Sequence, residues 1–140
     1  MKACTFFGHR DTPEKIEPVL QATLLDLIEN HAVQLFYVGN QGAFDAMVRR
    51  QLSVMEITHG IRYYVVLAYL PEQSDLLAED THTLYPEGLE LVPMRYAIAA
   101  RNRWMLEQSG FVVTYVRHDA GGAAQFKQIA ERKGKTIFAL

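Results

Sequence analysis

The sequence has little of what secreted and membrane-spanning proteins need. Its 140 residues include a single cysteine, Cys4, so no disulfide can form within the chain, which suits a reducing compartment. The longest apolar runs, such as 63–70, have the length of a strand and are too short to cross a bilayer. The polar stretch 8–11 interrupts the apolar start before a signal-peptide core could form. We therefore expect a cytoplasmic protein without a membrane segment.

Positive charge is also scarce. The formal net charge is −2, whereas a protein that binds duplex nucleic acid needs a basic face to displace counterions from the phosphates. Duplex nucleic acid is therefore an unfavourable partner, although a local basic pocket is compatible with this balance. Hydrophobic residues make up 49% of the sequence, which is enough for the core of one domain over residues 1–140.

Segments with the patterns of strands and helices alternate along the chain. Runs of apolar, β-branched and aromatic residues predict strands, and apolar residues at helical spacing predict helices between them. The predicted strands are residues 3–7, 33–38, 61–70, 111–116 and 136–140, and the predicted helices begin after Thr12, after Gly42, at Arg95 and at Gly121. This order predicts an α/β fold, a Rossmann-like three-layer sandwich with a mostly parallel five-stranded sheet and helices on both faces.

The stretch 71–93 has neither pattern. It carries six acidic residues and no lysine or arginine. Long irregular segments of compact domains are usually functional loops. We therefore interpret the acidic part, from Glu72 to Glu90, as a lid over a ligand site.

Glycine and polar residues follow the predicted strands at the sheet edge where open α/β folds bind ligands. After the first strand come Gly8, His9 and Arg10, and the arginine can pair with a phosphate or a carboxylate through two hydrogen bonds. The glycine there allows the backbone to turn sharply. A plain turn with a solvated arginine is the alternative explanation.

The turn between the second strand and the second helix is a second candidate. Its free backbone N–H groups and the helix dipole favour an anion beside Gly39, Asn40, Gln41 and Gly42. The turn is neither the dinucleotide fingerprint nor a P-loop. Asp45 falls in the first helical turn, where it either contacts a ligand or stabilises the dipole.

The pair Arg101 and Asn102 is the most informative. Met94, Ile98 and Met105 share one face of the third predicted helix, and the pair lies near the centre of that face. A charge on a buried face must be paired or solvated by polar groups. The partner of Arg101 is either a bound anion or a structural carboxylate, and we favour the anion.

Gly121 and Gly122 open the last predicted helix, where a ligand's sugar or phosphate could approach the backbone closely. Two histidines, His9 and His118, occur in the same loops, but no compact ligand spacing accompanies them. We therefore predict no metal site and no cofactor. No nucleophile elbow or pair of catalytic carboxylates occurs either, so the catalytic residues, if any, are unknown.

The motifs at 7–10, 39–45, 101–105 and 121–123, taken in this order, resemble the SLOG superfamily over essentially the whole chain. More closely, they resemble its bacterial YpsA-like branch. The resemblance implies a Rossmann-like fold that binds nucleotides or nucleotide-derived ligands, with Arg101 in the region where the family binds phosphate. The superfamily also contains DNA-processing proteins and the Lonely Guy phosphoribohydrolases, which cleave the N-glycosidic bond of cytokinin nucleotides.

The sequence departs from the phosphoribohydrolases at their catalytic segment. Those enzymes carry Pro-Gly-Gly-x-Gly-Thr-x-x-Glu after the fourth strand, and the glutamate is catalytic. Here residues 120–127 lack the proline, the third glycine and the threonine, and Lys127 lies at or beside the glutamate position. A lysine cannot replace a carboxylate that stabilises an oxocarbenium-like centre. We therefore expect a non-catalytic sensor or carrier of a nucleotide-like phosphorylated molecule.

Two alternatives stay open. The protein could be an N-glycosidic-bond hydrolase that uses Asp45 or Asp119 as its carboxylate. It could also be a structural or partner-binding protein in which the crevice is vestigial. The sequence is compatible with a monomer and with a homo-oligomer.

Overall fold

The computed structural model of the chain describes residues 1–70 and 82–140. Its strands are β1 (Lys2–Gly8), β2 (Val33–Val38), β3 (Arg62–Val66), β4 (Thr83–Leu84), β5 (Phe111–Tyr115) and β6 (Thr136–Ala139). Its α-helices are α1 (Glu17–Asn30), α2 (Gly42–His59), α3 (Ala97–Gln108) and α4 (Gly122–Arg132), with short 3-10 helices η1 (Glu14–Ile16), η3 (Leu89–Leu91) and η4 (Met94–Tyr96).

The strands form one sheet in the order β4-β3-β2-β1-β5-β6, and neighbouring strands pair in parallel. The predicted count of five strands is wrong, because the described residues form six. The additional strand, β4, pairs with β3. The Val65 N–H donates to the His82 carbonyl and the Leu67 N–H to the Leu84 carbonyl, each at 2.8 Å. A strand of two residues is too short to show an alternation of apolar and polar residues, so the sequence of 71–93 could not reveal it.

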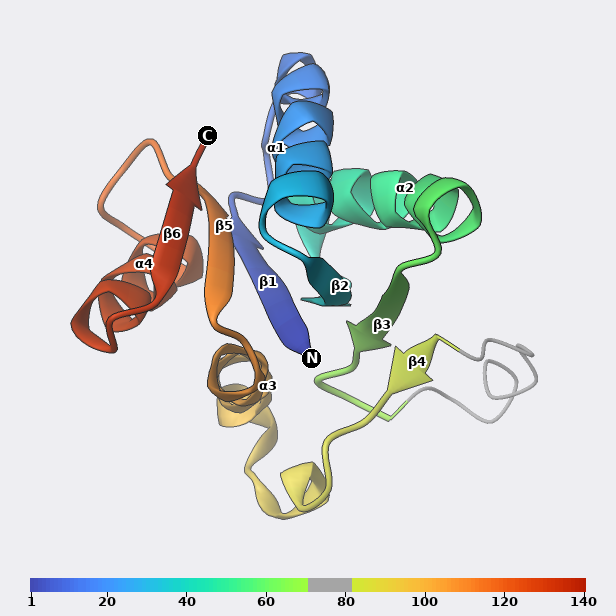
Figure 1. Ribbon diagram of the computed structural model, residues 1–140. Helices are drawn as coiled ribbons and strands as arrows, with labels where there is room; N and C mark the ends of the chain where they lie inside the picture. The colour runs from blue at the N-terminus through green and yellow to red at the C-terminus, as the bar shows by residue number, and fades with distance from the viewer. Residues whose placement is uncertain (71–81) are drawn as a thin grey trace.

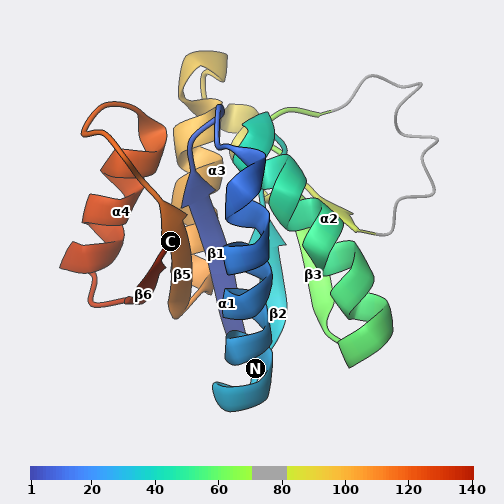
Figure 2. The same cartoon turned by 90° about the horizontal axis from the view of Figure 1, so that it is seen from above.

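The helices cover both faces of this sheet, which confirms the predicted Rossmann-like three-layer fold (Figures 1 and 2). Helices α1 and α2 pack on one face, where buried leucines of α1 and apolar residues of α2 meet β1 and β2. Helices α3 and α4 pack on the other face, where Met105, Leu106 and Phe126 contribute to the second core cluster. Strands buried on both faces explain the near-continuous apolar runs of the sequence.

The strand order reverses at β1, and this reversal identifies the carboxyl ends of the strands as the expected ligand site. From β1 the chain proceeds through β2, β3 and β4 on one side, then crosses to β5 and β6 on the other side of β1 (Figure 1). Open α/β sheets bind ligands outside the carboxyl ends of their strands where the order reverses in this way. The loops after β1 and β5 therefore meet at this position.

Helix α1 begins later than its sequence pattern predicts. The sequence predicts a helix that begins after Thr12, but the Thr12 hydroxyl donates to the His9 carbonyl at 2.6 Å and the turn η1 intervenes. The α-helix then starts at Glu17, with Pro18 in its first turn, where a missing N–H costs nothing. The predicted start after Thr12 is therefore wrong, because the hydroxyl closes the preceding turn and η1 lies between Thr12 and the α-helix.

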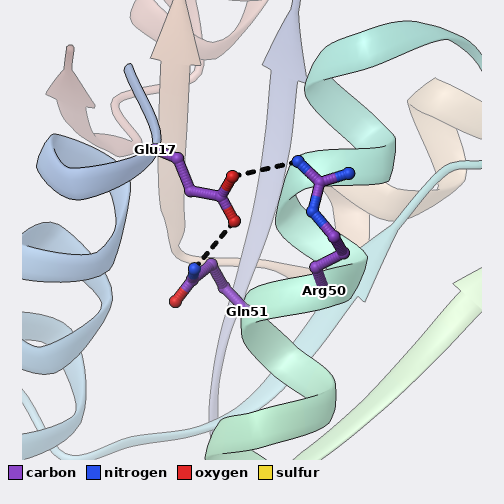
Figure 3. Close-up of polar contacts among 3 residues, drawn as sticks. All are labelled: Glu17, Arg50 and Gln51. Carbon is purple, nitrogen blue, oxygen red and sulfur yellow. Dashed lines mark hydrogen bonds and ion pairs between the residues drawn. The ribbon is translucent and has the colours of Figure 1, made fainter. Parts of the chain in front are cut away.

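Glu17 also ties α1 to α2 (Figure 3). Its carboxylate accepts hydrogen bonds from Arg50 Nη2 at 3.0 Å and from Gln51 Nε2 at 2.8 Å. The two donors are consecutive residues of α2, and they donate to different oxygens of the carboxylate. This contact fixes the start of α1 against the middle of α2.

Two further boundaries differ from the prediction. The third strand ends at Val66 rather than at residue 70, and the helix expected to begin at Arg95 begins at Ala97 after η4. Met94 therefore lies in a 3-10 turn and is 74% exposed, so its expected place on the buried face of α3 is wrong. Of the proposed lid, residues 72–81 lie outside the described residues, whereas 82–90 contain β4 and reach into η3.

Within residues 1–70 and 82–140, no helix has both the length and the apolar character required to cross a membrane.

Candidate ligand-binding site

A cavity of about 410 Å³ opens at the carboxyl ends of β1 and β5. Four separate segments line it: the loop after β1, the start of α2, one face of α3 and the start of α4. The lining residues are Phe6, Phe7, Gly8, His9, Arg10, Asp11, Gln41, Asp45, Ile98, Arg101, Asn102, Met105, His118, Ala120, Gly121, Gly122 and Ala123. This volume falls in the range of about 300–1,000 Å³ that is typical of small-molecule sites.

Most of the predicted site residues meet in this cavity. Its lining includes Gly8, His9, Arg10, Gln41, Asp45, Arg101, Asn102, Gly121 and Gly122. Three predicted residues, Gly39, Asn40 and Gly42, are not part of the lining but lie beside residues that belong to it. These three residues therefore shape the site through their contacts with lining residues, and they do not themselves line the cavity.

Arg101 is the central charge of the site. It follows Ala97 and precedes Met105 on one stripe of α3, and only 2% of its surface is exposed. Its guanidinium donates to the Val66 carbonyl at 2.9 Å and to Asn102 Oδ1 at 2.8 Å. It also donates to the side-chain oxygens of Gln41 and Asn40, the latter at 3.4 Å. Arg101 thus joins α3 to the ends of β2 and β3.

These partners are all uncharged. Among the described residues, no carboxylate oxygen lies within ion-pairing distance of Arg101. Burial lowers the pKa of Arg101, and the nearby Asp45 carboxylate opposes that effect. The structural salt bridge that was the alternative for Arg101 is therefore not formed in this part of the chain.

Asp45 lies close to Arg101 but does not touch it. The Asp45 carboxylate accepts a hydrogen bond of 3.0 Å from the Gln41 N–H, as an acidic side chain does at a helix start. Burial raises its pKa above the ordinary value, and this effect outweighs the Gln41 hydrogen bond and the nearby arginines, of which Arg101 acts most strongly. Burial therefore disfavours the charged form of the Asp45 carboxylate.

Gly39 separates these two opposite charges. A methyl group at Gly39 would lie 2.7 Å from Asp45 Oδ2 and 2.9 Å from Arg101 Nη1, closer than real contacts allow. The absence of a side chain at this position lets both charged groups approach the same point of the backbone. The glycine is therefore required by packing around the site.

The turn before α2 is largely filled by the protein itself. The Ala43 N–H donates to the Arg10 carbonyl at 2.8 Å, and the Gln41 N–H donates to Asp45. The Gly39 carbonyl accepts from Arg49 Nη1 at 3.2 Å. Two of the N–H groups that the sequence offered to an anion at this turn therefore have protein partners.

The start of α4 is open by comparison. Gly121 has a φ of 97°, which a side chain rarely tolerates, and no side chain caps the helix. The first turn of α4 contains no acidic residue, and a Cβ at Gly122 would meet no atom within 4 Å. Because Gly121, Gly122 and Ala123 line the cavity, the uncapped N–H groups and the positive end of the dipole lie at its wall.

Gly8 has a packing role at the end of β1. A Cβ there would lie 2.2 Å from the ring of Phe44, which is fully buried. The sequence interpretation of Gly8 as a sharp turn is incomplete, because the glycine first makes room for this ring of α2. Phe44 in turn holds the start of α2 against β1.

His118 and Asp11 line the cavity although neither belonged to the predicted site. The ring of His118 stacks on that of His9 with 3.9 Å between their centres and 12° between their planes. Both histidines follow strands that flank the point where the strand order reverses, and this signal was present in the sequence. By contrast Asp119, one of the two carboxylates considered for hydrolysis, is exposed and outside the lining.

The described residues contain no group of three or more histidine, cysteine or acidic side chains that could hold a metal ion. A scan against protein-family models and a search of curated proteins returned no match for the chain.

Proposed function

We propose that the cavity binds the phosphate of a nucleotide or nucleotide-derived small molecule, and that the protein is a sensor or carrier rather than an enzyme. The observation that carries this proposal is Arg101. It is a buried cation whose partners among the described residues are neutral oxygens, and one N–H of its Nη2 has no partner among them. An anion in the cavity would compensate a charge that is otherwise costly to bury.

The start of α4 supports the same proposal from another wall of the cavity. Uncapped N–H groups at a helix N-terminus bind phosphate groups in many α/β proteins. The open space at Gly122 lets a phosphate approach the backbone there. Arg10 and the α4 dipole add positive potential, which Asp11 and Asp45 partly offset.

The resemblance of the four loop motifs to the SLOG superfamily agrees with this proposal. Each of the four motifs contributes residues to the cavity lining, among them Gly8, Gln41, Arg101 and Gly121. We propose that the protein belongs to that superfamily and works in the cytoplasm. The lone thiol of Cys4, which is fully buried, stays reduced there.

A ligand screen tests the proposal directly. Ribonucleoside mono- and diphosphates and nucleotide sugars, each at millimolar concentration, should raise the melting temperature, because a ligand that binds only the native state shifts unfolding by mass action. Unphosphorylated nucleosides should shift it less. A flat response to every phosphorylated compound would contradict the proposal.

The same incubations test the hydrolase alternative. Only Asp45, of the two candidate carboxylates, lines the cavity, and it is engaged by the Gln41 N–H. Mass spectrometry of the mixtures should therefore show intact nucleotides and no steady release of ribose 5-phosphate. Turnover that disappears in Asp45→Asn would replace the binding function with hydrolysis.

A further inference from the structure

The stacked histidines form a flat aromatic surface in the cavity wall. His9 comes from the loop after β1 and His118 from the loop after β5, so the pair bridges the two strands at the reversal point. Their ring planes are nearly parallel, 12° apart, and their centres are 3.9 Å apart. Both residues line the cavity.

His9 is the fixed member of this pair. Only 8% of its surface is exposed, and its Nε2 accepts a hydrogen bond of 2.8 Å from the Arg117 N–H. A nitrogen that accepts carries no proton, so the ring is the neutral form with its proton on Nδ1. Burial first, and the neighbouring His118 second, lower the pKa of His9, which keeps this form at neutral pH. The edge of Tyr115 contacts the ring from the side, at 77° between the planes.

His118 is the exposed member. One face of its ring lies on His9, and among the described residues no other aromatic ring or cation covers it. The nearby guanidinium of Arg117 lies over Tyr115 instead, 4.3 Å from the ring centre. The residue itself is exposed and belongs to the cavity lining, so part of this positioned aromatic ring is accessible at the cavity.

Stacking is the chemistry that this arrangement suits. Parallel rings direct their nitrogen lone pairs in separate planes, so the pair does not converge on one metal ion. A planar ring with a free face instead favours a planar aromatic partner. The anion site at Gly122 lies four residues after His118 in the chain, which limits their separation to about 14 Å.

On the basis of the phosphate-binding function proposed above, we propose that His118 is a stacking platform for the base of a nucleoside phosphate. The ligand class is then a phosphate that carries a heteroaromatic base, and not a simple sugar phosphate. The phosphate lies at the start of α4 and the base lies on the outer face of His118. Stacking of one base on an aromatic side chain strengthens binding by roughly fivefold to a hundredfold.

Isothermal titration calorimetry with two kinds of probe tests this assignment. The four ribonucleoside 5′-monophosphates each carry a base, and ribose 5-phosphate carries the same phosphate and sugar without one. Wild-type protein should bind at least one of the nucleotides about tenfold or more tighter than ribose 5-phosphate. His118→Ala should abolish this preference and leave the affinity for ribose 5-phosphate unchanged, whereas His118→Phe should retain it.

The controls separate this inference from the function on which it rests. His118 is exposed, so neither substitution at this position should unfold the protein. The control variant is His59→Ala, which removes an exposed histidine at the far end of α2 and should keep the wild-type preference. Equal affinity for ribose 5-phosphate and every nucleotide, or an unchanged preference in His118→Ala, would overturn the stacking platform and leave phosphate binding intact. Loss of the preference in His118→Phe would overturn it too. Failure of all five compounds to bind would overturn both proposals.

Discussion

Two opposite charges, Arg101 and Asp45, are held close together in this site without forming an ion pair. Each would gain from direct contact, yet each is bound by neutral groups, Arg101 by amide and carbonyl oxygens and Asp45 by a backbone N–H. Such an arrangement leaves the cation without a charged partner among the described residues. It also leaves a carboxylate charged where burial disfavours charge.

Asp45 therefore predicts a pH-dependent effect on stability. Its folded-state pKa is raised above 3.8, so the folded protein holds the proton more tightly than the unfolded chain does. The stability gained in this way is complete below pH 3.8 and is lost as the pH rises through the folded-state pKa. At neutral pH, Asp45→Asn should therefore raise the free energy of unfolding, because a neutral amide removes the buried charge and its oxygen can still accept from Gln41.

Urea unfolding of the wild type and Asp45→Asn at a series of pH values measures this effect. The difference in the free energy of unfolding should be small at pH 3.8 and should grow in favour of the variant toward neutral pH. Asp119→Asn, which neutralises an exposed carboxylate outside the cavity, should show no comparable trend. A variant that is less stable than the wild type at neutral pH would mean that Asp45 is a required partner of Arg101.

At the scale of elements, α1 and α2 are connected by the hydrogen bonds of Glu17 to Arg50 and Gln51 (Figure 3). The hydrogen bond from Arg50, followed by that from Gln51, lowers the pKa of Glu17 below 4.5. The stabilisation from this contact is therefore complete above pH 4.5 and is lost as the pH falls through the lowered pKa. Because Arg50 is exposed, salt screens the charge–charge part of the contact.

Glu17→Gln should accordingly be less stable than the wild type above pH 4.5, and the difference should vanish in acid. The loss should also shrink at high salt, because part of it comes from the carboxylate charge; a neutral glutamine lacks that charge and has one acceptor oxygen in place of two. Thermal melts across pH and salt measure both trends, with Glu131→Gln, which neutralises an exposed carboxylate of α4, as the control. A difference that persists in acid would mean that the contact acts through shape and not through charge.

At the scale of the molecule, the sequence predicted the α/β class and the side of the sheet on which the loops meet. Strand and helix patterns alternate clearly, and parallel strands bring their carboxyl ends to one edge, so residues as distant as Gly8, Arg101 and Gly121 could be expected together. The sixth strand could not be predicted, because two residues carry no period. The exposure of Met94 was also hidden, since a 3-10 turn breaks the helical spacing that placed it on the face of Arg101.

Some functions of single residues depend on contacts that no periodicity encodes. The sequence marks Gly8 and Gly39 only as glycines, whereas the structure shows that Gly8 leaves room for the ring of Phe44 and Gly39 for the charged groups of Asp45 and Arg101. The ring stack of His9 and His118 joins residues that are far apart in the chain, and it became visible only when β5 was placed beside β1. Long-range pairings of this kind decide which side chains line the cavity together.

The central claim is that a phosphate binds in the cavity lined by Arg101 and the start of α4, and a negative charge placed at the start of α4 tests it most directly. Gly122→Asp adds a carboxylate in open space, and an acidic residue in the first helical turn favours the fold. Repulsion of ~3 kcal/mol is expected between two unit charges ~6 Å apart at an effective dielectric constant of ~20. Half of that energy weakens binding about tenfold.

The measurement is calorimetric titration of the ribonucleoside 5′-monophosphates into wild-type protein, Gly122→Asp and Gly110→Asp. The last variant is a matched control, since Gly110 is exposed, its Cβ also meets no atom within 4 Å, and it lies at the opposite end of β5. We predict that Gly122→Asp loses at least tenfold in affinity with an unchanged or raised melting temperature, while Gly110→Asp binds like the wild type. Equal affinity in all three proteins would contradict a phosphate site at the start of α4.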